Sequence, residues 1–169
     1  MTSILLFSDT HSFLDEKLMK HFDEVDELWH AGDIGFSSFF EPIEKQFPNK
    51  IIRAVHGNID DSKTRIIYPE NQIFHCENVK VFITHIGGYP DHYARGIKEK
   101  LIAEKPLLFI CGHSHILKVI FDKKLNVLHM NPGAAGNQGF HQTKTCLKFN
   151  IDKDKISDLK IIEFGKRGM

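Results

Sequence analysis

The chain of 169 residues has only three cysteines, no excess of either charge and no long apolar run. The cysteines at positions 76, 111 and 146 are far apart and form no Cys-x-x-Cys pair. This spacing argues against a disulfide framework and against a thiolate zinc site. Lys and Arg together number 22, and so do Asp and Glu, so the formal net charge is zero. Strong nucleic-acid binding through a broad basic surface is therefore not expected.

The apolar segments are short as well. The run near the N-terminus extends only from Ile4 to Phe7 and follows no basic residue. We therefore expect neither a signal peptide nor a membrane span, and we predict a cytoplasmic protein without a membrane partner. Hydrophobic residues make up 41% of the chain and charged residues 26%, which is ordinary for a globular protein. The length predicts a single domain over residues 1–169.

Short apolar runs that each end in a polar cluster recur along the chain. They are Ile4–Phe7, Glu27–His30, Ile51–Val55, Val79–Thr84 and Leu107–Cys111. Continuous apolar runs are typical of strands that are buried on both faces. In open sheets of such strands, ligands bind beyond the carboxyl ends. The polar clusters are therefore the candidate functional residues.

Helices and hairpins fill the spaces between these runs. Apolar residues at helical spacing predict helices over Asp15–Phe22, Ser38–Phe47 and Asp91–Lys105. Paired apolar runs predict three hairpins, namely Asn71–Cys76 with Val79–Thr84, Ile116–Phe121 with Leu125–Met130, and Thr145–Ile151 with Ile156–Phe164. An α/β fold of two packed sheets with helices outside would satisfy this pattern.

The polar clusters contribute two carboxylates, one amide and four imidazoles. These residues are Asp9, His11, Asp33, Asn58, His85, His113 and His115. The donor set suits borderline divalent metals such as manganese, iron, zinc, cobalt or nickel. Seven ligands exceed the needs of one tetrahedral ion, but they form two sites of four if one carboxylate is shared.

The charge of such a centre indicates its substrate. Two dications outweigh two carboxylates even when a bridging hydroxide is added, and neutral imidazoles and the amide contribute no charge. The centre should attract an oxyanion such as a phosphate ester. Two metals about 3.5–4 Å apart can activate a water for in-line displacement at phosphorus. We therefore expect metal-assisted hydrolysis of a phosphoester.

Taken together, the motifs resemble those of the calcineurin-like metallophosphoesterases. They are Asp9-Thr10-His11, Gly32-Asp33, Gly57-Asn58-Ile59-Asp60, Thr84-His85 and Gly112-His113-Ser114-His115. The short chain is similar to the small bacterial and archaeal phosphodiesterase branch of that superfamily, which implies a small phosphodiester as the substrate. The resemblance implies a four-layer α/β/β/α sandwich of two mixed β-sheets flanked by helices.

The resemblance also implies how the ligands are divided. Asp9, His11, Asp33 and His115 would hold one metal, and Asp33, Asn58, His85 and His113 the other. A metal-bridging hydroxide would be the nucleophile, and manganese is the metal we expect first. Catalytic roles are implied for Asp33, Asn58 and Asp60.

The sequence departs from the family pattern next to Asn58. Many members have His where this chain has Ile59, and that His acts as a leaving-group acid or phosphate binder. Asp60, which would orient it, is present. Because isoleucine cannot transfer a proton, we expect dependence on good leaving groups or on another donor. Arg95 and Tyr89, which follow His85 closely, are candidate substrate contacts, whereas His30, His56 and His129 are expected to be core or supporting residues.

Two other functions remain open at this point. A related fold serves as a subunit of the eukaryotic retromer coat, so a non-catalytic interaction scaffold is one alternative. A nuclease acting on short nucleic acid is the other. An apolar edge strand is compatible with a homo-oligomer, although no residue requires it.

Overall fold

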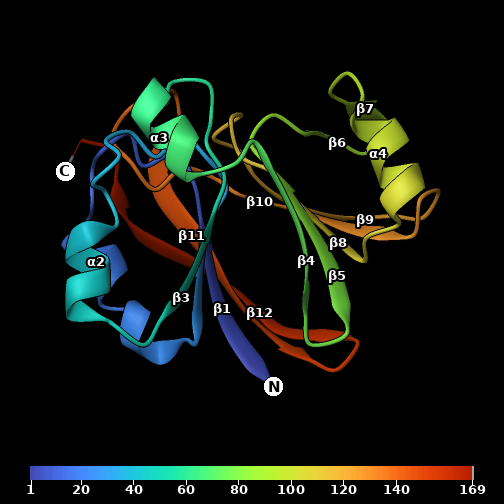
Figure 1. Ribbon diagram of the computed structural model, residues 1–169, viewed down its shortest axis with the longest axis horizontal. Helices are drawn as coiled ribbons and strands as arrows, with labels where there is room; N and C mark the ends of the chain where they lie inside the picture. The colour runs from blue at the N-terminus through green and yellow to red at the C-terminus, as the bar shows by residue number, and fades with distance from the viewer. Residues whose placement is uncertain (169) are drawn as a thin grey trace.

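A computed structural model describes residues 1–168, in which two five-stranded sheets pack face to face with helices outside them (Figure 1). The strand order is β12-β11-β1-β2-β3 in one sheet and β4-β5-β8-β10-β9 in the other. A small two-stranded sheet, β6-β7, lies apart from both. The first sheet contains β1 (Thr2–Phe7), β2 (Glu27–His30), β3 (Ile51–Ala54), β11 (Thr143–Asp152) and β12 (Lys155–Lys166).

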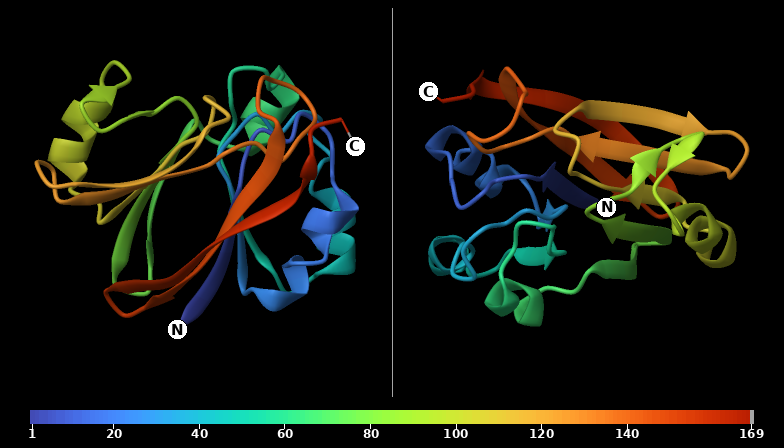
Figure 2. Two further views of the ribbon diagram at one scale, coloured as in Figure 1. Left: turned by 180° about the vertical axis from the view of Figure 1, so that it is seen from behind. Right: turned by 90° about the horizontal axis from the view of Figure 1, so that it is seen from above.

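The second sheet contains β4 (Asn71–Cys76), β5 (Val79–Thr84), β8 (Leu108–Ile110), β9 (Leu117–Asp122) and β10 (Val127–Pro132). In each sheet three neighbouring strands run parallel. They are β1, β2 and β3 in the first sheet, and β5, β8 and β10 in the second. The remaining strands pair antiparallel, and the long hairpin of β11 and β12 runs beside β1 (Figure 2).

The apolar runs form strands because their alternate side chains contact different cores. In β1, Ile4 and Leu6 point between the two sheets, whereas Leu5 and Phe7 point toward the helices on the outer face. In β8, Leu108 and Ile110 join the core between the sheets. The intervening Phe109 packs with residues of helix α4. The apolar parts of these two strands are thus buried on both faces, which explains why their sequences show no polar alternation.

The helices complete the outer layers. They are α1 (Glu16–Met19), the 3-10 helix η1 (Phe22–Glu24), α2 (Glu41–Gln46), α3 (Ser62–Ile67) and α4 (Ile97–Glu104). Leu18 and Ile43 attach α1 and α2 to the first sheet, and Ile97 and Leu101 attach α4 to the second. The predicted four-layer α/β/β/α sandwich and its three hairpins are confirmed.

Three helix predictions were too long, and one helix was missed. The segment Asp15–Phe22 is interrupted after Met19, and α2 begins only at Glu41. Residues 88–93 form the β6 (Gly88–Tyr89) and β7 (His92–Tyr93) hairpin, so α4 begins at Ile97, after Gly96 at a φ of 80°. Helix α3 was not predicted from the sequence. Its only buried residue is Thr64, so the helix has no apolar face that would give a helical pattern. Within residues 1–168, no helix has the length and apolar character that crossing a membrane requires.

Candidate metal centre

All seven predicted ligands lie at the edge where the carboxyl ends of the parallel strands meet. Asp9 and His11 follow β1, Asp33 follows β2, and Asn58 follows β3. In the second sheet, His85 follows β5 directly, and His113 and His115 follow β8. The strand topology therefore brings together residues that are up to 106 positions apart in the chain.

Six of the seven candidate ligands form two groups of three, each with one carboxylate and two imidazoles. One group is Asp9, His11 and His115, and the other is Asp33, His85 and His113. Within each group the candidate ligand atoms all lie within 4.8 Å of one another. The His115 Nε2 atom is 3.1 Å from Asp9 Oδ1. This spacing lets one ion contact all three side chains of a group.

Asp33 belongs to the second group and also lies next to the first. Its Oδ1 atom is 3.2 Å from His85 Nε2, and its Oδ2 atom is 3.6 Å from His11 Nε2. Asn58 belongs beside the second group, because its Oδ1 atom is 3.1 Å from His85 Nε2. The geometry is compatible with a carboxylate shared by two ions, each of which would have four protein ligands.

Buried polar atoms without partners show that the centre fits cations. Asp9 Oδ1 and His11 Nε2 are buried and have no hydrogen-bond partner. A buried carboxylate oxygen or imidazole nitrogen in this state is costly, and a metal ion would satisfy it. His85 Nδ1 lies 2.8 Å from the Ala31 carbonyl oxygen, to which it donates a hydrogen. That bond leaves Nε2 free to bind metal, and such outer hydrogen bonds commonly orient ligating histidines.

The metal-binding loops have an unusual backbone. Asp9, His11, Asp33, His113 and His115 all have positive φ angles, between 47° and 67°. Non-glycine residues rarely adopt this region, and residues that do so cluster at functional sites. Backbone hydrogen bonds stabilise the first two loops against each other: the amides of Asp9, His11 and Ser12 donate to the carbonyls of residues 32, 33 and 34.

Glycine permits the close approach of these loops at Gly32 and Gly57. Gly32 has a φ of 98°, and a Cβ atom there would lie 2.5 Å from His85 Nδ1. A Cβ atom at Gly57 would overlap Asp33 Oδ1. The glycines that precede Asp33 and Asn58 in the sequence therefore make room for the ligands of the second group.

Asp60 connects two of the loops through their backbone. Its carboxylate accepts hydrogen bonds from the amides of Ile34 at 3.1 Å, Gly35 at 2.6 Å and Gly57 at 2.6 Å. The side chain is buried and both of its oxygens are engaged. Asp60 thus holds together the loops that carry Asp33 and Asn58, and the catalytic role expected for it stays a prediction.

His30 connects the first two ligand loops through hydrogen bonds to Thr10 and Gly32. The Gly32 amide donates to His30 Nδ1 at 3.1 Å, so Nε2 carries the proton and donates to Thr10 Oγ1 at 2.9 Å. The Thr10 hydroxyl in turn donates to the Ile34 carbonyl. Complete burial lowers the pKa of His30 to about 3. Protonation of Nδ1 would break the bond to Gly32, so the native state requires a neutral ring.

This network predicts acid sensitivity of the metal-free protein. Between pH 6.5 and about 3, the unfolded state binds a proton at His30 that the folded state excludes, so stability is lost as the pH falls. At pH 4.5 the expected loss from this residue is about 3 kcal/mol. The measurement is urea unfolding in a chelator at pH 7.0 and 4.5. The free energy of unfolding of His30→Gln should depend less on pH than that of the wild type. His75→Gln, on the exposed side of β4, should keep the wild-type pH dependence. Equal pH dependence in all three proteins would refute this role of His30.

His141 contacts His115, an interaction that no pattern in the sequence indicates. Its Nδ1 atom is 3.3 Å from His115 Nδ1, and its Nε2 atom is 2.9 Å from the Gly136 carbonyl oxygen. Since His141 Nε2 must donate to that carbonyl, His141 Nδ1 accepts a hydrogen from His115 Nδ1. The chain of bonds leaves His115 Nε2 unprotonated and directed toward Asp9, which is the form that binds metal.

The second group binds a proton at His85 more readily than a free imidazole does, because the pKa of His85 is raised. Burial lowers the pKa of His85, but the hydrogen bond to Asp33 and the charges of Asp9 and Asp33 outweigh it, so the pKa is raised. Burial raises the pKa of Asp33, yet its contact with His85 lowers it overall. A cation must displace this proton, and metal affinity should therefore fall as the pH falls.

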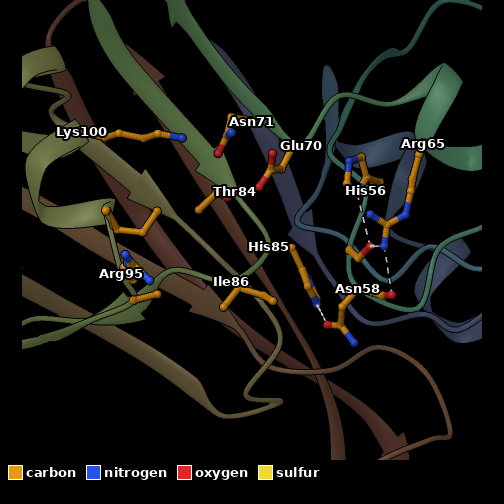
Figure 3. A pocket seen from close by; sticks show the side chains of 14 residues that line it. His56, Asn58, Arg65, Glu70, Asn71, Thr84, His85, Ile86, Arg95 and Lys100 are labelled. Atoms are coloured by element: carbon orange, nitrogen blue, oxygen red, sulfur yellow. Dashed lines mark hydrogen bonds between the residues drawn. The ribbon is translucent and has the colours of Figure 1, made fainter.

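A cavity of about 400 Å³ opens beside the second group. Asn58, His85 and Arg95 are among its lining residues (Figure 3). Tyr89 is not among them, because it lines a smaller recess where Lys118 Nζ lies 3.5 Å from its ring centre. Of the two predicted substrate contacts, the structure brings only Arg95 to the cavity.

Comparisons with solved structures agree with this architecture. A predicted phosphoesterase from Streptococcus pneumoniae TIGR4 is 21% identical, with a TM-score of 0.67 over 96% of this chain and 89% of that chain. An archaeal phosphodiesterase is also 21% identical, with a TM-score of 0.72 over 95% of this chain and 99% of that one. Vps29 from Entamoeba histolytica, solved with Zn²⁺, is 13% identical, with a TM-score of 0.72 over 96% and 99%. At these identities the likeness shows a common fold.

The family is established by the sequence itself. A search of curated proteins found no match. The model of the calcineurin-like phosphoesterase superfamily domain, however, matches residues 2–154, a range that contains every ligand loop described above. The chain belongs to the calcineurin-like phosphoesterase superfamily.

Proposed function

We propose that the protein is a metal-dependent phosphodiesterase. The observation that carries the proposal is the pair of ligand groups linked by Asp33, whose two oxygens are directed to His85 and His11. The superfamily is metal-dependent, and the centre retains a complete donor set for two ions. The likeness to an archaeal phosphodiesterase supports the choice of a diester.

Two divalent ions would be held by this chain's residues in two sets. Asp9, His11, Asp33 and His115 fit the first ion, and Asp33, Asn58, His85 and His113 fit the second. Manganese is our first choice among borderline metals, with iron, zinc, nickel and cobalt as alternatives. When bound, the metal pair supplies Lewis-acid polarisation of the phosphate and lowers the pKa of the attacking water.

The chain's own residues position the substrate and limit its approach. Asp9 is completely buried, whereas Asn58 and His113 are exposed, so an ester reaches the centre from the side of these two residues. The carboxylates of Asp9 and Asp33 would hold two dications without cancelling their charge, so the loaded centre would favour an oxyanion. Ile59, which is 45% exposed beside Asn58, offers no proton to the leaving group.

The test of the proposal is turnover of simple esters. Protein stripped of metal and supplied with Mn²⁺ should hydrolyse bis(p-nitrophenyl) phosphate faster than p-nitrophenyl phosphate. The reverse preference would leave a phosphoesterase that is not a diesterase. No turnover of either ester with Mn²⁺, Fe²⁺, Zn²⁺, Ni²⁺ or Co²⁺ would refute the enzymatic proposal.

Turnover also separates the enzyme from the interaction scaffold. A Vps29 of similar fold has been solved with Zn²⁺, so metal binding alone does not distinguish the two functions. The intact donor set favours the enzyme here. The balanced charge of the chain disfavours a nuclease that grips a long duplex.

Ile59→His should add the missing proton donor. An imidazole next to Asn58 can protonate a departing alkoxide, so turnover of a diester with a poor leaving group should rise at least about tenfold. The measurement compares kcat for an alkyl and a p-nitrophenyl diester. The p-nitrophenyl diester should change little because its leaving group needs no proton.

The matched control for this variant is Ile66→His, which adds an imidazole on the exposed side of α3. It should alter neither substrate. If Ile59→His changed both esters by the same factor, position 59 would not face the leaving group.

A further inference from the structure

The cavity beside the second ligand group lies between α3 and α4. Arg65 and His56 form one side, and Arg95 and Lys100 the other, with Glu70, Asn71 and Thr84 between them (Figure 3). Three cationic side chains thus face a single carboxylate, that of Glu70. The cavity has a net positive lining even without a contribution from its histidines.

The cationic side chains on the two sides of the cavity differ in their hydrogen-bond partners. Arg65 donates from Nε to the Asp60 carbonyl at 2.7 Å and from Nη2 to the carbonyls of Gly57 and Asn58, each at 3.1 Å. It therefore supports the loop that carries Asn58. Arg95 and Lys100, by contrast, make no side-chain hydrogen bond or ion pair in the part of the chain that the structure describes. Their charges are available to a ligand.

The cavity has a defined position relative to the metal centre. Of the seven candidate ligands, only Asn58 and His85 line it. A phosphate held between the two ligand groups would therefore lie at its mouth, and only a substituent of that phosphate would extend inside. Arg95 and Lys100 would then meet the substituent, not the phosphate that is cleaved.

We propose that this cavity recognises a second anionic group, a phosphate, on the substrate. The inference rests on the proposed function and narrows it to diesters that carry an additional phosphate. Glu70 would repel an anion near β4, which leaves the side formed by Arg95 and Lys100 as the binding position. Asn71 and Thr84 can hydrogen-bond to a hydroxylated linker such as a sugar between the two phosphates.

The neighbouring cavity is a poorer site for an anion. Arg95 also lines that cavity, but so do the carboxylates of Asp91, Glu99 and Asp122. Its Lys124 ammonium is already paired with Asp91. Of these two cavities, the one beside His85 combines unpaired cationic side chains with access to the metal centre.

The kinetic test uses two esters that differ by one phosphate. They are thymidine 5′-(p-nitrophenyl phosphate) and the same compound with a 3′-phosphate, assayed with Mn²⁺. The wild type should favour the 3′-phosphorylated ester by about tenfold in kcat/KM, because two exposed cations pair with the added dianion. Arg95→Gln/Lys100→Gln should reduce this ratio to near one. Lys98→Gln, on the same helix but not lining this cavity, should keep it.

A binding test separates this inference from the proposed function. Inorganic phosphate added to the metal-stripped protein should shift the backbone amide resonances of residues 95–100 in NMR spectra. The shifts should vanish in Arg95→Gln/Lys100→Gln and persist in Lys98→Gln. Thermal unfolding of each variant verifies that it is folded.

Each outcome decides one of the two claims. If neither ester is hydrolysed but phosphate shifts residues 95–100, the proposed function fails and the anion site stands. If both esters are hydrolysed equally well, or the double variant keeps the wild-type ratio, the second-phosphate inference fails and the phosphodiesterase stands.

Discussion

Asp33→Asn is expected to lower kcat/KM for an aryl phosphodiester by about a thousandfold, which corresponds to about 4 kcal/mol of transition-state stabilisation. The two oxygens of Asp33 are directed to imidazoles of different groups, Oδ1 to His85 and Oδ2 to His11. Asparagine keeps the shape but removes the negative charge and replaces one oxygen with an amide nitrogen that cannot bind a cation. Both metal positions are weakened at once, whereas loss of a residue that only orients a ligand typically costs 10- to 100-fold.

Metal content and metal-dependent stability test the same substitution without turnover. Wild-type protein should bind two Mn²⁺ per chain, and its unfolding temperature should rise with added Mn²⁺ because the ions bind only the folded state. Both effects should be nearly absent in Asp33→Asn. The metal-free variant should remain folded. Asp9 and Asp33 are both buried, and without bound cations their negative charges repel each other, so removing one charge relieves this repulsion.

Asp154→Asn provides the matched control. Asp154 is exposed in the turn between β11 and β12, far along the chain from the ligand loops. It should change neither activity nor metal content. An Asp33→Asn protein with two bound metals and wild-type activity would show that the two ligand groups do not form the catalytic centre.

The strands and their carboxyl ends could be predicted because they leave a simple signal. A strand with one face on the core between the sheets and the other on a helix layer must be apolar throughout, as Ile4–Phe7 is. The residue that follows such a strand emerges at the site edge. The positions of Asp9, Asp33 and His85 therefore follow from the pattern of runs.

The short helices left a weaker signal. Ile66 and Ile67 in α3 are 84% and 55% exposed, so their apolar character indicates no buried face. The available clue was Asp61, whose Oδ1 accepts from the Thr64 amide and caps the helix. In α4, helical spacing was extended back to Asp91, past the turn at Gly96 that begins the helix.

The interactions that hold the ligands could not be predicted from spacing. His141 reaches His115 from a loop 26 residues later, and no periodic pattern records that contact. The positive φ angles of five ligands could not be predicted either, because aspartate and histidine, unlike glycine, do not indicate a positive φ in a sequence. These features depend on how separate loops pack, which only the folded chain defines.

Asp60→Ala should cause the largest loss of stability among single substitutions near the centre. Removing the carboxylate leaves the buried amides of Ile34, Gly35 and Gly57 without their acceptor. Hydrogen bonds to a charged group contribute about 1.5–3 kcal/mol each, so a total near 4 kcal/mol is expected after partial relaxation. Urea unfolding of the metal-free protein measures the change. Asp61→Ala, which removes only the exposed cap of α3, should cost clearly less.

Activity and amide exchange together distinguish positioning from direct catalysis by Asp60. Without its carboxylate, the loops that carry Asp33 and Asn58 are no longer joined, so Mn²⁺ affinity should fall about 10- to 100-fold and activity should fall with it. Hydrogen exchange at Gly35 and Gly57 should accelerate in Asp60→Ala and stay slow in Asp61→Ala. Lost activity with unchanged protection of both amides would instead mean that Asp60 acts on the substrate, because the carboxylate could then have contributed nothing to holding the loops.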